Sequence, residues 1–254
     1  MTTTPIVRHT LDNGLRLVVS EDHVAPVVAV NVWYDVGSRH ERAGRTGLAH
    51  LFEHLMFQGS RNVGPAEHFS LLQGVGATLN GTTSFDRTNY FEAVPTHAYE
   101  LALWLEADRM GTLLDALTQE NLDNQRDVVK NERRQRYDNV PYGTAWEQLF
   151  ALLYPEDHPY HHLPIGSMAD LDATTLDDCV DFFTRHYAPA NATLTVVGDV
   201  DPAAVVDRVE HYSGGIPTLA EATTAPDGTI GPRGDEVRAV THEPVPAETR
   251  YEVF

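Results

Sequence analysis

The apolar positions of this chain follow two spacings. Short alternating or continuous apolar runs predict strands, and apolar residues that recur every three or four positions predict helices. In the segment 172–186, for example, we expect Leu176, Val180 and Phe183 to face inward from a helix. The predicted strands are 7–11, 15–19, 27–36, 76–83, 88–94 and 192–197, and the predicted helices, besides two described below, are 66–74, 98–114, 145–153, 172–186 and 203–212.

The order of these elements indicates the fold class. Strands come first, helices occupy the middle, and one more strand and a helix follow. This order predicts an α+β fold in which helices pack on a mostly antiparallel sheet. The segment 217–236 is rich in Pro, Gly, Ala and Thr and predicts a linker, so the sequence divides into a domain over 1–216, a linker over 217–236 and a short segment over 237–254.

The segment 46–59 predicts a buried helix with a polar stripe. Thr46 suits the start of this helix and Gly59 its end. His50, Glu53 and His54 lie at positions i, i+3 and i+4, so their side chains share one face. A buried polar stripe is unfavourable unless a partner satisfies it, and a metal ion would do so. The apolar residues of the helix are Leu48, Leu51, Phe52, Leu55, Met56 and Phe57.

The sequence His50-Leu51-Phe52-Glu53-His54 carries the ingredients of a zinc peptidase site. Its pattern, H-x-x-E-H, reverses the H-E-x-x-H of many zinc peptidases. Both imidazoles can reach one metal ion, and Glu53 can reach the same place. The simpler alternative is a pair of core histidines that donate hydrogen bonds to carbonyl groups. The motif therefore makes the chain a candidate zinc hydrolase that attacks peptide bonds.

A catalytic zinc usually takes three protein ligands, so a third ligand is needed. The best candidate is Glu132, in a long polar helix that begins near Thr118 and has one apolar edge at Val128 and Val129. Spacing alone favours another role for Glu132, in which it lies on a solvated helix face and pairs with Arg136 at i+4.

At this point the chain resembles a known family. The motif at 50–54, followed by Glu132 within Val-Val-Lys-Asn-Glu-Arg-Arg, is similar to the inverted zincins of peptidase family M16, which include pitrilysin, insulysin and the mitochondrial processing peptidase. The resemblance runs from about Val7 to about Pro217. Its further matches, in order along the chain, are 11–15, 37–39, 80–83, 158–160 and 187–192.

The resemblance implies a fold, a set of roles and an activity. It implies the LuxS/MPP-like metallohydrolase fold, with His50, His54 and Glu132 as ligands of Zn²⁺ and Glu53 as general base. It implies a zinc endopeptidase that cleaves peptides or unstructured segments; the alternative is a non-catalytic or incomplete subunit that needs a partner half. Many family members carry a second Glu seven residues before the ligand Glu. Here that position is Gln125, whose amide adds no negative charge beside the metal.

The resemblance also points to a peptide-binding strand. An exposed strand edge can accept an extended peptide as an additional strand. In the family the strand that matches 78–83 does this, which assigns substrate contact to Asn80 and Gly81. Gly81 stands where the family commonly has Ala, and we expect it to loosen the strand slightly. Without the resemblance, the simpler interpretation is an ordinary hairpin with Asn80 near its edge.

The family unit has two similar domains in sequence, and the second lacks the metal motif. In this chain 238–242 and 249–254 look like the first strands of a second, truncated domain. Either the chain is a fragment of a longer protein, or a partner subunit, in a homodimer or a heterodimer, supplies the missing half.

Composition adds a few constraints. The net charge of −19 argues against nucleic acid and anionic membranes as partners, and it suits either basic peptides or plain solubility. The single cysteine, Cys179, excludes an internal disulfide and suggests packing. His158, His161 and His162 form another candidate metal cluster, although a turn of the resembled fold explains them better. We find no signal peptide or membrane-spanning stretch, which predicts a soluble, cytoplasmic protein.

Overall fold

The computed structural model describes residues 5–218, 224, 226–231 and 237–240. Within this part of the chain, six strands form one sheet in the order β1-β2-β6-β3-β5-β4. Only β2 and β6 run parallel; all other neighbours are antiparallel. The strands are β1 (Ile6–Thr10), β2 (Arg16–Glu21), β3 (Val27–Tyr34), β4 (Thr78–Thr83), β5 (Thr88–Pro95) and β6 (Ala192–Gly198). The predicted α+β class with a mostly antiparallel sheet is confirmed.

The core lies between the sheet and the helices on one of its faces. On the central strand β3, Val28, Val30 and Val32 are buried while Val27 and Trp33, which point to the other face, are exposed. This alternation is the signature of a strand with one face in the core. The exposed fractions of those three valines are 1% or less, so they form the centre of the apolar core.

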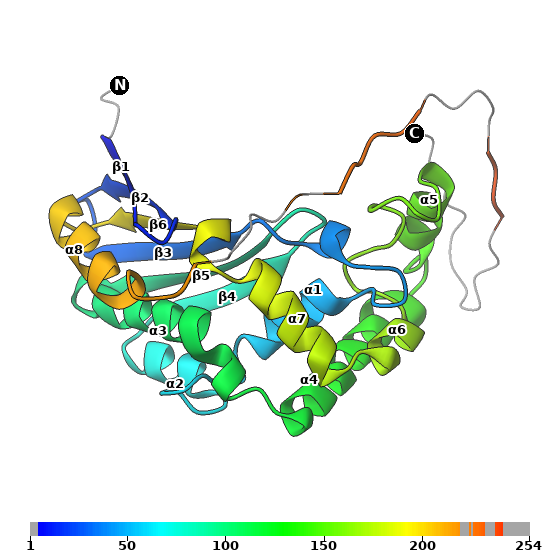
Figure 1. Cartoon of the computed structure of the whole chain (residues 1–254), viewed down its shortest axis with the longest axis horizontal. Coiled ribbons are helices and arrows are strands. Elements are labelled where there is room, and N and C mark those ends of the chain that lie inside the picture. The colour runs from blue at the N-terminus through cyan, green and yellow to red at the C-terminus, as the bar shows by residue number, and fades with distance from the viewer. Residues whose placement is uncertain (1–4, 219–223, 225, 232–236, 241–254) are drawn as a thin grey trace.

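The helices divide into two groups along the sheet (Figure 1). Helices α2, α3 and α8 lie toward the left of the view, where α8 contacts β2 and α2 contacts β4, whereas α1, α4, α5, α6 and α7 lie from its middle to the right. Contacts between α1 and α4, and between α1 and β4, bring the motif helix against both the long polar helix and the edge strand. The bounds are α1 (Leu48–Leu55), α2 (Glu67–Gly74), α3 (Tyr99–Thr112), α4 (Gln119–Arg133), α5 (Ala145–Leu153), α6 (Met168–Ala173), α7 (Leu176–His186) and α8 (Pro202–Ser213).

The prediction that Thr46 starts the motif helix was wrong. Helix α1 begins after Gly47, and the buried carboxylate of Glu41 accepts hydrogen bonds from the N–H groups of Gly47 and Ala49 at 2.9 Å and 2.7 Å. The hydroxyl of Thr46 instead donates to Asp170. A carboxylate at a helix N-terminus satisfies free N–H groups and interacts favourably with the helix dipole. Glu41 therefore anchors the helix that carries the motif.

The predicted helix over 172–186 is two helices. Helix α6 ends at Ala173, and α7 begins after Thr175, whose side chain accepts a hydrogen bond from the N–H of Asp178. In α7, Phe183 is buried as expected, but Val180 is 40% exposed and does not face the core. The buried apolar residues of α7 are Cys179, Phe182 and Phe183.

The predictions for the C-terminal part fall largely outside the described residues. The linker over 217–236 and the truncated domain over 237–254, with its strands at 238–242 and 249–254, stay predictions.

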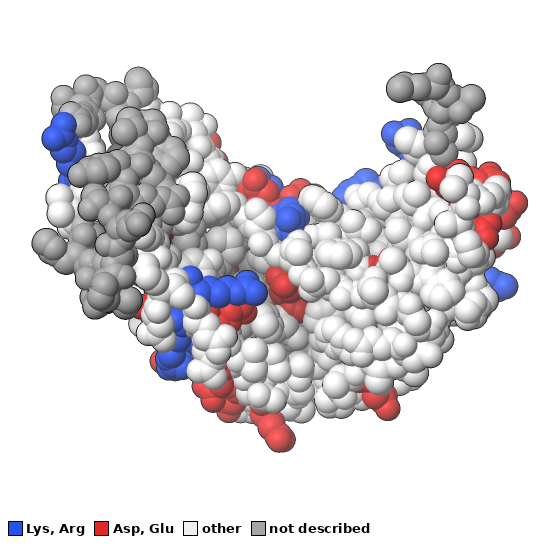
Figure 2. Space-filling model, turned by 180° about the vertical axis from the view of Figure 1, so that it is seen from behind, with Lys and Arg blue, Asp and Glu red and all other residues white. Residues whose placement is uncertain are grey.

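Seen from behind, the described surface is hollowed between its two ends, and charged side chains gather in small groups of either sign (Figure 2).

Candidate metal centre

The two histidines of the motif converge with Glu132. His50 and His54 project from α1, and Glu132 lies near the C-terminal end of α4. Their Nε2 atoms lie 3.6 Å and 3.4 Å from Oε2 of Glu132, and the two imidazole rings are 4.9 Å apart at an angle of 87°. One potential ligand atom from each of the three residues lies within 4.8 Å of the others. Two helices therefore bring two imidazoles and a carboxylate to one point.

This separation fits a tetrahedral zinc site. Zinc binds His nitrogen and carboxylate oxygen at about 2.0–2.2 Å, which puts ligand atoms roughly 3.4 Å apart around a tetrahedral ion. The distances from both histidines to Glu132 match this spacing closely. Three protein ligands would leave the fourth position to a water molecule, as in catalytic zinc sites.

The protonation states suit metal ligation. Burial, reinforced by the neighbouring His54, lowers the pKa of His50 to about 4. A hydrogen bond with His54 lowers the pKa of Glu132. At neutral pH the site therefore offers a neutral imidazole from His50 and an ionised carboxylate, the forms that bind zinc. Glu132 also pairs with Arg136 at 2.8 Å, as its spacing suggested, but it uses Oε1 and keeps Oε2 for the histidines.

The side chain of Glu53 extends from the motif helix α1 toward the edge strand β4. Its Oε2 accepts a hydrogen bond from Thr83 Oγ1 at 2.5 Å. Burial raises the pKa of Glu53, and the bond from Thr83 opposes that rise. The structure thus holds a carboxylate with a raised pKa beside the histidine pair, which suits a group that accepts and returns a proton.

The two further residues assigned by resemblance lie on the elements that frame this site. Gln125 is buried on α4, two turns before Glu132. Asn80 is exposed on β4, and its Oδ1 accepts the N–H of Gly81 at 2.9 Å. The roles of Gln125 beside the metal and of Asn80 and Gly81 in substrate binding stay predictions.

Strand β4 has a free edge on the side away from β5, since no other strand of the described chain pairs with it. At the hairpin, the N–H of Ser84 bonds to the carbonyl of Arg87 at 2.8 Å. Hydrogen-bonded and non-bonded pairs alternate along an antiparallel ladder, so every second residue of β4 directs its N–H and C=O groups outward. The outward groups belong to Leu79, Gly81 and Thr83. An added strand would pair with these groups once the N–H of Gly81 is released from Asn80.

A second cluster has the composition of a metal site but already holds a cation. His68, Glu92 and Glu106 are all buried and lie close together. The guanidinium of Arg109, itself 1% exposed, bonds to Glu106 and lies 3.7 Å from Glu92. Burial, followed by repulsion from Glu106, raises the pKa of Glu92 well above its usual value. Burial alone would also raise the pKa of Glu106, but the charge of Arg109 outweighs this effect and the pKa of Glu106 is lowered. Arg109 neutralises this cluster, and we expect one zinc per chain, at the first site.

Arg109→Met is expected to lower the free energy of unfolding by about 3–5 kcal/mol, because it leaves buried carboxylates without their cation. Urea denaturation measures this change. The control is Arg61→Met, which removes an exposed pair with Asp115 and should cost less than about 1 kcal/mol. Equal losses in the two variants would contradict the assignment of Arg109 as an internal counter-ion.

The loop histidines do not form a metal site. His158 pairs with the carbonyl of Gly228, His161 with that of Tyr154, and His162 with Glu41. Since each has its own partner, the turn interpretation is favoured. His162 also supports Glu41 and so, indirectly, the start of α1.

Cys179 is buried on α7, and burial raises its pKa to about 12, which agrees with a packing role.

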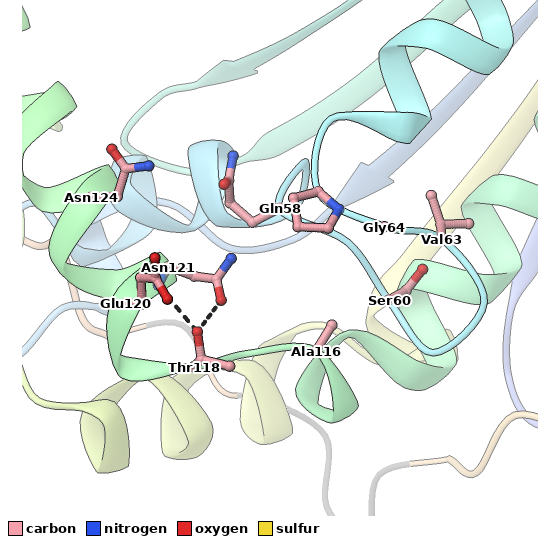
Figure 3. Close-up of a pocket in the computed structure, with 10 residues that line it drawn as sticks. Gln58, Ser60, Val63, Gly64, Ala116, Thr118, Glu120, Asn121 and Asn124 are labelled. Carbon is pink, nitrogen blue, oxygen red and sulfur yellow. Dashed lines mark hydrogen bonds between the residues drawn. The ribbon is translucent and has the colours of Figure 1, made fainter.

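A pocket of about 450 Å³ lies at the opposite end of α4 from Glu132 (Figure 3). Its wall combines amide and hydroxyl groups with the apolar side chains of Val63, Pro65 and Ala116. Thr118 and Asn121, at the start of α4, bond to each other. It therefore belongs to the helix start and not to the metal centre. Its lining residues include Gln58, Ser60, Glu120 and Asn124.

Among the described residues, no helix combines the length and the apolar character that crossing a membrane requires.

Comparison with known proteins agrees with this architecture. Residues 16–156 match the family described as Insulinase (Peptidase family M16), and residues 173–252 match the description Peptidase M16 inactive domain. The first match covers more than half of the chain. The chain belongs to peptidase family M16.

Among its relatives are proteins named as zinc proteases. The chain is 36% identical to the zinc protease PqqE of Helicobacter pylori over 92% of this chain and 52% of the relative. It is 32% identical to an uncharacterized zinc protease of Mycobacterium leprae over 82% and 46%. A solved structure of a protease from Helicobacter pylori aligns with a TM-score of 0.84 at 35% identity, over 90% of this chain and 54% of that one. The chain spans about half the length of the curated relatives it matches.

Two residues of the site had no role predicted from the sequence. Thr83 holds Glu53, and Glu41 anchors α1. Thr83 could have been found, because strand alternation puts it on the same face as Gly81. Glu41 gave no such signal, since its partners depend on the path of the loop between β3 and α1.

Proposed function

We propose that this chain is the zinc-binding half of an endopeptidase that hydrolyses peptides or unstructured protein segments. The observation that carries the proposal is the convergence of His50, His54 and Glu132 at the spacing of zinc ligands, with Glu53 alongside. Membership of a peptidase family whose relatives are named zinc proteases supports the same conclusion.

The side chains have distinct tasks in this proposal. His50, His54 and Glu132 would hold zinc, which supplies a water of lowered pKa and polarises the scissile carbonyl. Glu53 takes the proton from the attacking water and later delivers it to the leaving amine. Its raised pKa brings the protonated and ionised forms closer in energy near neutral pH, which helps one carboxylate serve both steps.

Substrate binding uses the free edge of β4. The outward backbone groups of Leu79, Gly81 and Thr83 pair with an extended peptide, which gives affinity with little demand on sequence. Asn80 currently bonds to the N–H of Gly81, and in this proposal it releases that group to the peptide. An extended segment bound here passes beside Glu53, which contacts the same strand through Thr83.

A second function is supported by the length of the chain. The chain spans about half of its curated relatives, and its C-terminal part matches a domain described as inactive. On these grounds we propose that a second domain or subunit of the same family completes the substrate site, and that the chain by itself is an incomplete subunit. We also propose that the protein is located in the cytoplasm.

Removal of the metal tests the proposal. Purified in its native assembly, with any downstream segment or partner chain, the protein should cleave a quenched fluorescent peptide of random-coil sequence. We expect 1,10-phenanthroline to abolish cleavage and stoichiometric Zn²⁺ to restore it. Zinc binding without cleavage in the complete assembly would favour the non-catalytic alternative, and cleavage that resists the chelator would contradict a zinc peptidase.

A further inference from the structure

Thr83 joins the free edge of β4 to the carboxylate of Glu53. It is the last residue of β4, and its Oγ1 donates to Glu53 Oε2 at 2.5 Å. Its backbone groups face the free edge of the strand. One residue therefore presents its backbone to an incoming strand and its side chain to the proposed general base.

The strand also packs closely against the stem of Glu53. A Cβ built on Gly81 would lie 3.1 Å from Cγ of Glu53 and 3.2 Å from Cδ1 of Tyr90. A side chain at this position would therefore require Glu53 or Tyr90 to move by a few tenths of an ångström. Gly81 and Thr83 share one face of the strand, so the first makes room for the side chain of Glu53 and the second holds its end. The expectation that Gly81 also loosens the strand slightly stays a prediction.

We propose that Thr83 is a positioning residue, which fixes the carboxylate of Glu53 in the orientation that proton transfer requires. This inference rests on the proposed peptidase function. Glu has several rotatable bonds, so its carboxylate can point in several directions; the bond from Thr83 selects one of them. Small errors in the placement of reacting groups lower rates strongly, so loss of this bond should slow turnover without weakening peptide binding.

The neighbouring threonine provides a matched control. Thr82 points to the opposite face of β4, where its Oγ1 donates to Asn89 Oδ1 at 2.6 Å and accepts a hydrogen bond from Nη1 of Arg87. Neither partner lies on α1 or is a proposed metal ligand. Thr82→Val and Thr83→Val make the same change of hydroxyl to methyl on adjacent positions of one strand. Comparing them separates the bond to Glu53 from a general effect of valine on β4.

We expect Thr83→Val to lower kcat on a quenched fluorescent peptide by about tenfold, with KM and zinc content close to those of the unmodified protein. Thr83→Ser, which keeps the hydroxyl, should restore kcat to within about threefold. Thr82→Val should leave kcat unchanged. All four proteins are compared in the native assembly, and circular dichroism confirms that each is folded.

Three outcomes overturn the inference in different ways. If the unmodified protein cleaves the peptide and Thr83→Val loses no more kcat than Thr82→Val, then Thr83 does not position Glu53 and the proposed function still stands. If Thr83→Ser fails to restore kcat, the hydroxyl is not the group that matters. If the unmodified assembly binds zinc and does not cleave, the proposed function fails, and the role of Thr83 fails with it.

Discussion

Glu53→Gln is expected to lower the turnover of a peptide substrate by about 10²- to 10⁴-fold while zinc stays bound. Glutamine has nearly the same shape and can still accept the hydrogen bond from Thr83, so the architecture between α1 and β4 is preserved. It cannot take a proton from water. Since Glu53 is not one of the three converging residues, metal content should not change.

The measurement combines kcat on a quenched fluorescent peptide with zinc content from elemental analysis. Glu120→Gln, an exposed change at the start of α4, serves as the control and should alter neither quantity. Undiminished cleavage by Glu53→Gln would show that another group is the base. Loss of zinc from this variant would show that Glu53 is a ligand.

The second large effect is expected from Glu132→Ala, which should weaken zinc binding by more than the 10- to 100-fold typical of losing an outer-shell partner. The carboxylate lies 3.6 Å and 3.4 Å from the two imidazoles, so its removal leaves a site with two protein ligands. Catalysis should fall with the metal. Competition with a fluorescent zinc chelator measures the affinity.

Asp127→Ala is the matched control for this change, because Asp127 lies on α4 and is exposed. It removes one carboxylate from the same helix, so it reproduces any general loss of negative charge. Equal zinc affinities for Glu132→Ala and Asp127→Ala would show that Glu132 does not bind the metal and that its carboxylate serves only in the ion pair with Arg136.

The sequence predicted most elements that carry the site. Thr118 accepts the hydrogen bond expected of a helix start, and α4 begins where predicted. The two predicted strands β4 and β5 pair as a hairpin, and a hydrogen bond from the N–H of Ser84 to the carbonyl of Arg87 closes its turn. These features depend on neighbours in sequence, which is why local patterns were sufficient.

The errors arose where a distant residue decides the local structure. A threonine before an apolar run normally caps a helix, but at α1 the carboxylate of Glu41 satisfies the free N–H groups and Thr46 bonds to Asp170. Likewise, Val128 was assigned to the apolar edge of α4 but is 40% exposed, while Val129 is fully buried. No spacing rule separates two adjacent valines when the position of the packing partner is unknown.

Glu132 shows the limit of spacing most clearly. From spacing alone it was a surface residue paired with Arg136, and only the resemblance made it a ligand. The structure contains both interactions, one on each carboxylate oxygen. The distance between α1 and α4 decides the matter, and a single sequence does not encode that distance in any local pattern.

The most direct test is an anomalous difference map at the zinc edge, from crystals of the zinc-loaded protein. We predict one strong peak per chain within about 2.0–2.2 Å of Nε2 of His50, Nε2 of His54 and a carboxylate oxygen of Glu132. A peak elsewhere, or zinc that contacts the histidines while Glu132 turns away to Arg136, would contradict the coordination on which the proposed chemistry depends.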